Sequence, residues 1–435
     1  MSERTTHPQH RSTRTPGAAG PGTPLDLDID VDFLRTTLMD LLRIPSPSGR
    51  TDAVMQHVGD RLNELGYSFD ITRRGILRAT LPGRTAGVRR AVIVHADTIG
   101  LMVKQVKANG RLEVVPVGSH SARFSEGAHV VVFTDDFDRV YTGTVLPLKS
   151  SGHTFGDEID TQGVGWEIVE VRIDEPVTSA ADVRALGIEV GDFVALDAAP
   201  QITRGGYVKS RHLDDKAGLA ACLAALKALA ESEEAVLQVG AQFLVTIGEE
   251  VGFGATHGLS PDLAELVAVD NAVVAEGQNS QEDMVSVGML DMTGPFDYHL
   301  SRRLHALARD HDIPAVRDVY RHYRSDAAPA LEAGIEARAA LLGFGLESSH
   351  GHERTHLDGL VALARLLVVY LQSGLTFDDW DRADAGTLED FPSDSVQPAP
   401  PEPLDRTVVA DRADGQDGEP LSVDAEAAGR PAPAT

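Results

Sequence analysis

The feature that most constrains the fold is an alternation of strand-length apolar segments with longer helical patterns. Residues 90–97, 238–248, 266–274 and 338–346 are largely apolar. Helical patterns such as "KAGLAACLAALKALAES" lie between these segments. Strands that are apolar along most of their length are buried on both faces, as in an α/β sheet covered by helices. The sequence therefore predicts an α/β domain.

Residues 102–197 follow a different pattern. Short strand candidates bounded by Gly or Asp, such as "EGAHVVVFTDD" and "WEIVEVRID", occur one after another. This pattern is typical of a small β-barrel or sandwich. The segment "SAADVRALGIEVGD" is expected to supply its one helix. We expect this insert to divide the α/β domain into residues 30–101 and 198–377.

Both ends of the chain have the composition of disordered segments. Residues 1–29 are rich in Pro, Gly, Thr and Ser, and residues 378–435 are acidic and rich in Pro. Such segments bury too little apolar surface to fold, although an acidic tail can also serve as a binding segment. The N-terminus lacks the apolar core of a secretory signal, and no apolar run is long enough to span a bilayer. We expect no membrane association.

Charge and cysteine content narrow the possible functions. The chain has 39 Lys and Arg residues against 66 Asp and Glu residues, for a net charge of -27. Such acidity argues against binding to the phosphate backbone of nucleic acid. The single cysteine, Cys222, allows no intrachain disulfide, which fits a reducing cytosol. We therefore expect a cytoplasmic protein.

Imidazole and carboxylate side chains gather where the predicted strands end. They are His95, Asp97, Asp214, Asp215, Glu249, Glu250, Asp270, His350, His352 and His356. Open α/β sheets bind ligands beyond the carboxyl ends of their strands, and this mixture of side chains suits zinc, cobalt or manganese. Each residue alone also has a structural interpretation; Asp214, for example, could cap the following helix.

The number of these groups fits a centre of two divalent ions about 3.5–4 Å apart. Such a centre needs a bridging carboxylate and two terminal ligands on each ion. Asp214 fits the bridge. His95 and Asp270 fit one ion, and Glu250 and His350 fit the other.

Glu249 is then left as the catalytic base beside the two ions. It would take a proton from the attacking water and give it to the leaving amine. Asp97, two residues after His95, would orient that imidazole.

Four motifs in this order, "HADTIG", "LDDKAG", "GEEVG" and "VAVDNAV", resemble metallopeptidase family 42, the glutamyl and deblocking aminopeptidases. The resemblance covers residues 31–376 approximately. It implies a phosphorylase/hydrolase-like α/β domain with a mixed sheet flanked by helices, an inserted β-barrel and a dodecamer of tetrahedral form. It also implies two divalent ions per subunit and the same ligands, base and supporting acid.

The sequence departs from the family pattern in three places. Thr98 stands where the family usually has an acid, and "EEVGFGA" is one residue shorter than usual. The last motif reads "SSHGHERTH", which leaves the final ligand open between His350 and His352, with His350 favoured by position. These departures resemble a bacterial subgroup associated with the osmoprotectant dipeptide N-acetylglutaminylglutamine amide.

Other residues are weaker candidates. Ser325 and Asp326 occupy the place of a family segment near the substrate, but either could be a helix N-cap. Arg324 or Arg354 could pair with a substrate carboxylate or form surface salt bridges. His120 could reach the site of a neighbouring subunit. His212 is expected to lie behind the ligands or to be exposed, and Cys222 to pack in the core of a helix.

The function favoured by these residues is metal-dependent removal of N-terminal residues from short peptides. The same chemistry would serve a deacylase or a hydrolase of a blocked dipeptide. A non-catalytic relative need not retain all the ligands and the base. A glycosidase with two carboxylates would leave the histidines and Asp270 without a role.

Overall fold

The computed structural model describes residues 23–377, so the expectations for residues 1–22 and 378–435 lie outside the described part of the chain. Its main sheet has twelve strands. They are β1 (Phe69–Ile71), β2 (Leu77–Leu81), β3 (Val88–His95), β10 (Gln201–Ile202), β11 (Tyr207–Ser210), β12 (Gly240–Thr246), β13 (Glu265–Val274), β14 (Val285–Asp291), β15 (Gly294–Pro295), β16 (Ala315–Val319), β17 (Arg338–Glu347) and β18 (Glu353–His356).

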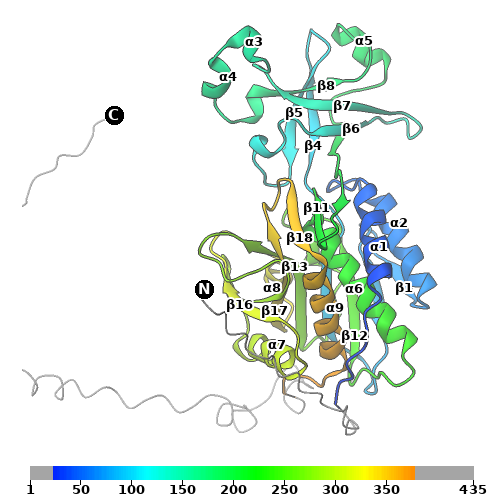
Figure 1. The fold of residues 1–435 in the computed structure, drawn as a ribbon. Coiled ribbons are helices and arrows are strands. Elements are labelled where there is room, and N and C mark those ends of the chain that lie inside the picture. Colours follow the sequence, from blue (N-terminus) through cyan, green and yellow to red (C-terminus); the bar gives the residue numbers. More distant parts are fainter. Residues whose placement is uncertain (1–22, 378–435) are drawn as a thin grey trace, which may run out of the picture. The chain divides into compact units, whose positions relative to one another are not determined.

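The sheet is mixed, and its centre consists of the four strands expected from the sequence. The strand order is β1-β2-β12-β3-β13-β17-β18-β11-β10, with β14 also pairing with β17 and carrying β15 and β16 (Figure 1). The neighbours β12, β3, β13 and β17 are parallel. Alternate residues of β3 belong to different cores: Val92 and Val94 to one, Ala91 and Ile93 to another. The sheet is therefore covered on both faces.

Six α-helices within the described residues belong to this α/β region. They are α1 (Val31–Arg43), α2 (Asp52–Glu64), α6 (Leu213–Glu231), α7 (Tyr298–Asp310), α8 (Ala327–Glu332) and α9 (Leu357–Gln372). Helix α1 begins where the Asp30 carboxylate accepts a hydrogen bond from the Phe33 N–H at 2.9 Å. Its buried leucines recur at helical spacing, and Pro45 follows its C-cap, Ile44. Helix α6 packs against α1 and α9 (Figure 1).

The insert forms a closed barrel with strand order β4-β5-β8-β7-β6-β9, shown at the top of Figure 1. Its strands are β4 (Gly100–Val106), β5 (Leu112–Val117), β6 (His129–Phe133), β7 (Val140–Pro147), β8 (Val169–Ile173) and β9 (Phe193–Leu196). The expected helix is α5 (Ala180–Ala185), which begins with a capping box between Ser179 and Asp182. The expectation of one helix is wrong, because α3 (Gly152–Phe155) and α4 (Glu158–Thr161) are also present.

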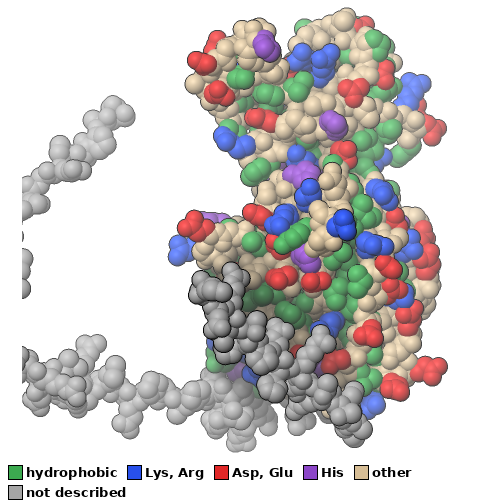
Figure 2. Space-filling view, in the orientation of Figure 1, with side chains coloured by type: hydrophobic (Ala, Val, Ile, Leu, Met, Phe, Trp, Pro, Cys, Tyr) green, Lys and Arg blue, Asp and Glu red, His purple; other side chains and the backbone are tan. Residues whose placement is uncertain are grey.

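The segment before α1 contacts helix α9. The Leu25 N–H donates to the Gln372 side chain at 3.1 Å, and that amide donates back to the Leu25 carbonyl at 2.9 Å. Figure 2 shows acidic and basic side chains mixed over the face in view, in both the α/β region and the barrel. None of the helices within residues 23–377 has the length and apolarity needed to cross a membrane.

Candidate metal centre

The sheet register brings three of the predicted site segments to one level. His95 is the last residue of β3 and lies opposite Thr246, the last residue of β12. On the other side of β3, Ile93 lies opposite Ala268 of β13. Two residues further along, Asp270 therefore lies level with His95. Asp270 is inside β13 and not at its end, because β13 extends beyond β3.

His95, Glu249 and Asp270 form the first group of candidate metal ligands. One ligand atom from each lies within 4.8 Å of the others. The His95 Nε2 atom is 3.9 Å from Glu249 Oε2 and 4.0 Å from Asp270 Oδ1. The group therefore includes Glu249, the residue that the sequence left as an unligated base.

Asp214, Glu250 and His350 form the second group, again with ligand atoms within 4.8 Å of one another. The His350 Nε2 atom is 3.3 Å from Glu250 Oε2 and 3.4 Å from Asp214 Oδ2. The other oxygen of Asp214 lies 3.1 Å from His95 Nε2 in the first group. Asp214 thus faces both groups, which is the position that a bridging carboxylate needs.

Both imidazoles are held through Nδ1, so that Nε2 faces the carboxylates. His95 Nδ1 lies 2.9 Å from the Asp97 carbonyl, and His350 Nδ1 lies 2.8 Å from the Ser119 carbonyl of the barrel. A backbone acceptor at Nδ1 keeps its proton there and leaves the Nε2 lone pair for a metal. His352, the alternative last ligand, is exposed and belongs to neither group.

The Asp97 carboxylate holds the turn that carries the two glutamates. Its oxygens accept hydrogen bonds from the N–H groups of Glu249 at 3.2 Å and Glu250 at 3.4 Å. Ser48 donates to the same carboxylate. The carboxylate of Asp97 comes no closer than 3.6 Å to His95 Nδ1, whereas the Asp97 carbonyl lies 2.9 Å from it. The imidazole is therefore held by the carbonyl of Asp97 and not by its carboxylate.

The sequence reasoning missed two buried residues that hold Asp214. The Glu353 carboxylate accepts from the N–H groups of Leu213 at 2.7 Å, Asp214 at 3.3 Å and His350 at 2.9 Å. Asn271 donates its amide to Asp214 Oδ2 at 2.8 Å. The signals were an acid three residues after His350 and an amide directly after Asp270.

Burial and crowding shift the ionisation of both groups. Burial raises the pKa of Glu249 well above its usual value, and the charge of Asp270 raises it further. Burial and then the charge of Asp214 do the same to the pKa of Asp270. Burial lowers the pKa of His350, but its hydrogen bonds with Asp214 and Glu250 outweigh this and raise that pKa to about 12. Glu249 and Asp270 therefore favour their protonated forms unless a cation lies beside them.

This set of donors fits divalent ions. Four carboxylates and two imidazoles converge, and the two atoms Asp215 Oδ1 and Asn271 Oδ1 are buried without a hydrogen-bond partner among the described residues. Bound cations would take the place of the protons and relieve the repulsion between the carboxylates. Oxygen with imidazole nitrogen is the ligand combination of zinc, cobalt and manganese sites.

Asp326 contacts residues on both sides of the turn that carries Glu249 and Glu250. The Asp326 carboxylate accepts from the Thr246 hydroxyl at 2.5 Å and from the Ala255 N–H at 3.0 Å. A Cβ atom on Gly254 would lie 1.6 Å from Asp326 Oδ1, so the close approach requires glycine. Asp326 does occupy the N-cap position of α8, but its side chain makes no capping hydrogen bond.

The weaker candidates lie outside the two groups. Arg354 binds both carboxylate oxygens of Glu282 at 2.7 Å, and Arg324 binds Glu332 at 2.5 Å, so both form the expected salt bridges. His120 packs edge-on against a tryptophan of its own barrel, with 5.0 Å between ring centroids. His212 contacts the Leu196 carbonyl at 3.0 Å, and Cys222 is buried in α6 as expected. Asp214 does not cap α6, because His212 occupies the N-cap position.

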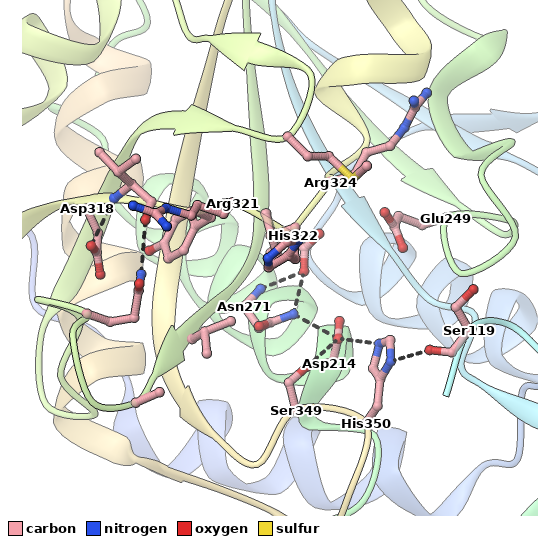
Figure 3. Close-up of a pocket in the computed structure, with 18 of the residues that line it drawn as sticks. Ser119, Asp214, Glu249, Asn271, Asp318, Arg321, His322, Arg324, Ser349 and His350 are labelled. Carbon is pink, nitrogen blue, oxygen red and sulfur yellow. Dashed lines mark hydrogen bonds and ion pairs between the residues drawn. The ribbon is translucent and has the colours of Figure 1, made fainter. Parts of the chain in front are cut away.

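A cavity of about 1550 Å³ opens beside the two groups (Figure 3). Its wall includes Asp214, Glu249, Glu250, Asp270 and His350. The volume exceeds the 300–1,000 Å³ or so that is usual for a small-molecule site. A short peptide therefore has room to reach the candidate ligands.

A model of the M42 glutamyl aminopeptidase family matches residues 75–366, which contain both groups. The chain belongs to this family. The M42 chain is 38% identical over 336 residues to YhfE of Bacillus subtilis, named as a candidate aminopeptidase, with 77% of this chain and 96% of that protein covered. It is 26% identical over 228 residues to a glutamyl aminopeptidase of Lactococcus lactis, with 51% and 62% covered.

Solved structures share the fold. An aminopeptidase from Desulfurococcus kamchatkensis superposes with a TM-score of 0.72 at 21% identity, covering 82% of this chain and 99% of that one. The TET1 peptidase of Pyrococcus horikoshii gives 0.68 at 21% identity, covering 78% and 99%. The expected fold class is confirmed. As a member of M42, the protein is a metal-dependent peptidase.

Proposed function

We propose that this M42 chain is a di-metal aminopeptidase that removes N-terminal residues from short peptides. The observation that carries the proposal is the pair of ligand groups joined by Asp214 at the wall of a peptide-sized cavity. His95 and Asp270 would hold one ion, and Glu250 and His350 the other. Zinc or cobalt suits these ligands best, with manganese as a third choice.

The side chains around the ions divide the remaining work. Two divalent ions supply Lewis-acid polarisation of the scissile carbonyl when bound. Glu249 would accept a proton at its carboxylate from the attacking water and pass it to the leaving amine. Asp97 fixes the Glu249 N–H and thereby the position of the base.

A comparison of peptides with free and blocked N-termini distinguishes an aminopeptidase from a hydrolase of another amide. The full chain, loaded with cobalt or zinc, is incubated with matched peptides that carry free or acetylated N-termini, and products are identified by mass spectrometry. We expect stepwise loss of N-terminal residues from the free peptides only. Cleavage of the acetylated set, or of neither, would replace the aminopeptidase with a hydrolase of another amide.

We also propose a cytoplasmic homo-oligomer. The Pyrococcus horikoshii TET1 peptidase is described as assembling into a tetrahedron or a large octahedral shell, and a solved structure of PhTET1-12s is described as a dodecamer. Light scattering should give a particle of many subunits, and a monomer at working concentration would overturn this. Specialisation for the blocked osmoprotectant dipeptide stays a prediction; it requires that dipeptide to be cleaved faster than free peptides.

A further inference from the structure

Basic side chains gather on one part of the cavity wall, which also includes Asp318, and Glu276 lines the cavity as well. The segment 317–324, "RDVYRHYR", begins in β16 and contains three arginines and a histidine. All four line the same cavity as the ligand groups; they are Arg317, Arg321, His322 and Arg324. In Figure 3, Arg321 lies on the side of the cavity where Asp318 lies, whereas Asp214 and His350 lie away from it, with His322 in between.

The guanidinium of Arg321 has no protein partner among the described residues and is free to bind a ligand. Arg321 is exposed, and its guanidinium makes no hydrogen bond, ion pair or ring contact with any residue of the described stretch 23–377. The neighbouring arginines are partnered: Arg324 binds Glu332 at 2.5 Å, and Arg317 lies 3.4 Å from His305 Nδ1. A planar guanidinium without a protein partner at a cavity wall can bind a carboxylate through two parallel hydrogen bonds.

The backbone that carries Arg321 is held in place. The buried carboxylate of Asp318 accepts from the Asn279 N–H at 2.9 Å and the Ser280 N–H at 2.8 Å. The Gln278 amide donates to the Val319 carbonyl at 3.1 Å. The loop 278–280 therefore fixes the end of β16, two residues before Arg321. Only the exposed arginine side chain remains to be ordered by a ligand.

The two regions of the cavity match the two ends of a short peptide. If the chain is an aminopeptidase, the N-terminal residue of the substrate lies at the candidate metal ligands. The other fixed charge of a short peptide is its C-terminal carboxylate, which would extend toward the basic region. We propose that Arg321 binds this C-terminal carboxylate, so that short free-acid peptides are the preferred substrates. The inference rests on the proposed function and adds a substrate class to it.

This assignment separates two classes of substrate that the metal ligands alone treat alike. A peptide with a free C-terminus supplies the carboxylate. A C-terminally amidated compound, including the blocked osmoprotectant dipeptide, does not supply it and leaves Arg321 without a partner. The inference and the predicted specialisation for that dipeptide therefore exclude each other.

The test compares matched tripeptides that differ only in a C-terminal acid or amide. We measure kcat and KM for the metal-loaded full chain, Arg321→Gln and a control, Arg73→Gln. Arg73 is exposed in the turn between β1 and β2, outside the cavity and without a side-chain contact among the described residues. The wild type should prefer the acid by about tenfold or more in kcat/KM, the size of one charge-assisted contact. Arg321→Gln should remove this preference by raising KM for the acid alone.

The outcomes fall into distinct classes. Equal cleavage of acid and amide by the wild type, or an equal effect of Arg321→Gln on both, would overturn the inference and leave the proposed function intact. An effect of Arg321→Gln confined to substrates with an acidic first residue would also overturn it, in favour of a side-chain carboxylate. Failure to cleave either peptide would instead reject the proposed function and the inference together.

Discussion

Two buried clusters of charged residues differ in how their charge is balanced. In the first, fully buried Arg90 and Glu265 form an ion pair at 2.9 Å. The guanidinium also donates to the carbonyls of Tyr370 at 2.6 Å and Ser373 at 3.1 Å. Glu265 accepts from the Tyr370 hydroxyl and the Thr376 N–H. Each charge in this cluster has an opposite charge and complete hydrogen bonding.

The second cluster is the pair of ligand groups, where carboxylates outnumber imidazoles by four to two. No lysine or arginine of the described residues forms an ion pair with these carboxylates. A buried cluster that balances its own charge needs no ligand, whereas a cluster with excess negative charge requires cations from outside. The difference in balance therefore separates a structural cluster from a functional one.

The largest expected effect is on catalysis. Glu249→Gln should lower kcat by about 10²- to 10⁴-fold, because the proton carrier is lost, while the protein keeps its metal ions. The control is Glu231→Gln, an exposed glutamate paired with Lys227. Turnover is followed with a peptide that the wild type cleaves.

Two results would change the role of Glu249. Full turnover in Glu249→Gln would exclude it as the base. Loss of a metal ion would make it a ligand, as its distance of 3.9 Å from His95 Nε2 allows.

The balanced cluster should respond in stability and not in catalysis. Arg90→Met leaves Glu265 buried without its partner, which should lower the free energy of unfolding by about 3–5 kcal/mol. The double variant Arg90→Met/Glu265→Leu should recover much of this loss. Urea unfolding measures the stability, and kcat at 25 °C should stay near that of the wild type. A fall in kcat with unchanged stability would contradict the structural role.

The pH dependence of stability tests a third buried ionisable group. Lys216 Nζ donates to the Ile44 carbonyl at 2.5 Å and has no ion-pair partner among the described residues. Burial lowers the pKa of Lys216 from 10.5 to about 7. Between these pH values the unfolded state binds more protons than the folded state. Stability relative to Lys216→Met should therefore rise with pH, by up to about 1.4 kcal/mol per unit, and this contribution is lost as pH falls toward 7.

Denaturant unfolding of both metal-free proteins from pH 6 to 10 measures this slope. Parallel stability curves for the two proteins would mean that Lys216 keeps its ordinary pKa in the folded chain.

The central sheet and the site segments could be predicted from local sequence. The strands β3, β12, β13 and β17 are apolar along most of their length, which marks them as buried. His95 and Asp270 are polar residues within such strands, and their cost of burial points to a function. Motif order supplied the rest of the ligand set, because periodicity alone does not pair Asp214 with His350.

The supporting contacts could not be predicted, because they depend on backbone groups of distant segments. Glu353 binds the N–H of Leu213, 140 positions earlier in the chain. The Ser119 carbonyl that orients His350 comes from the barrel, 231 positions away. The sequence shows that Asp97 is acidic, but not that its carboxylate faces two N–H groups while its carbonyl faces His95. Helices of four residues such as α3 lack the length for a recognisable period.

The most direct test of the central claim is the number of metal ions per chain. Metal-free full-length protein is saturated with zinc or cobalt, dialysed and measured by inductively coupled plasma mass spectrometry, alongside His350→Ala and the exposed control His352→Ala. We predict two ions in the wild type, fewer than two in His350→Ala and two in His352→Ala. A wild type with one ion or none, or a loss confined to His352→Ala, would contradict the account.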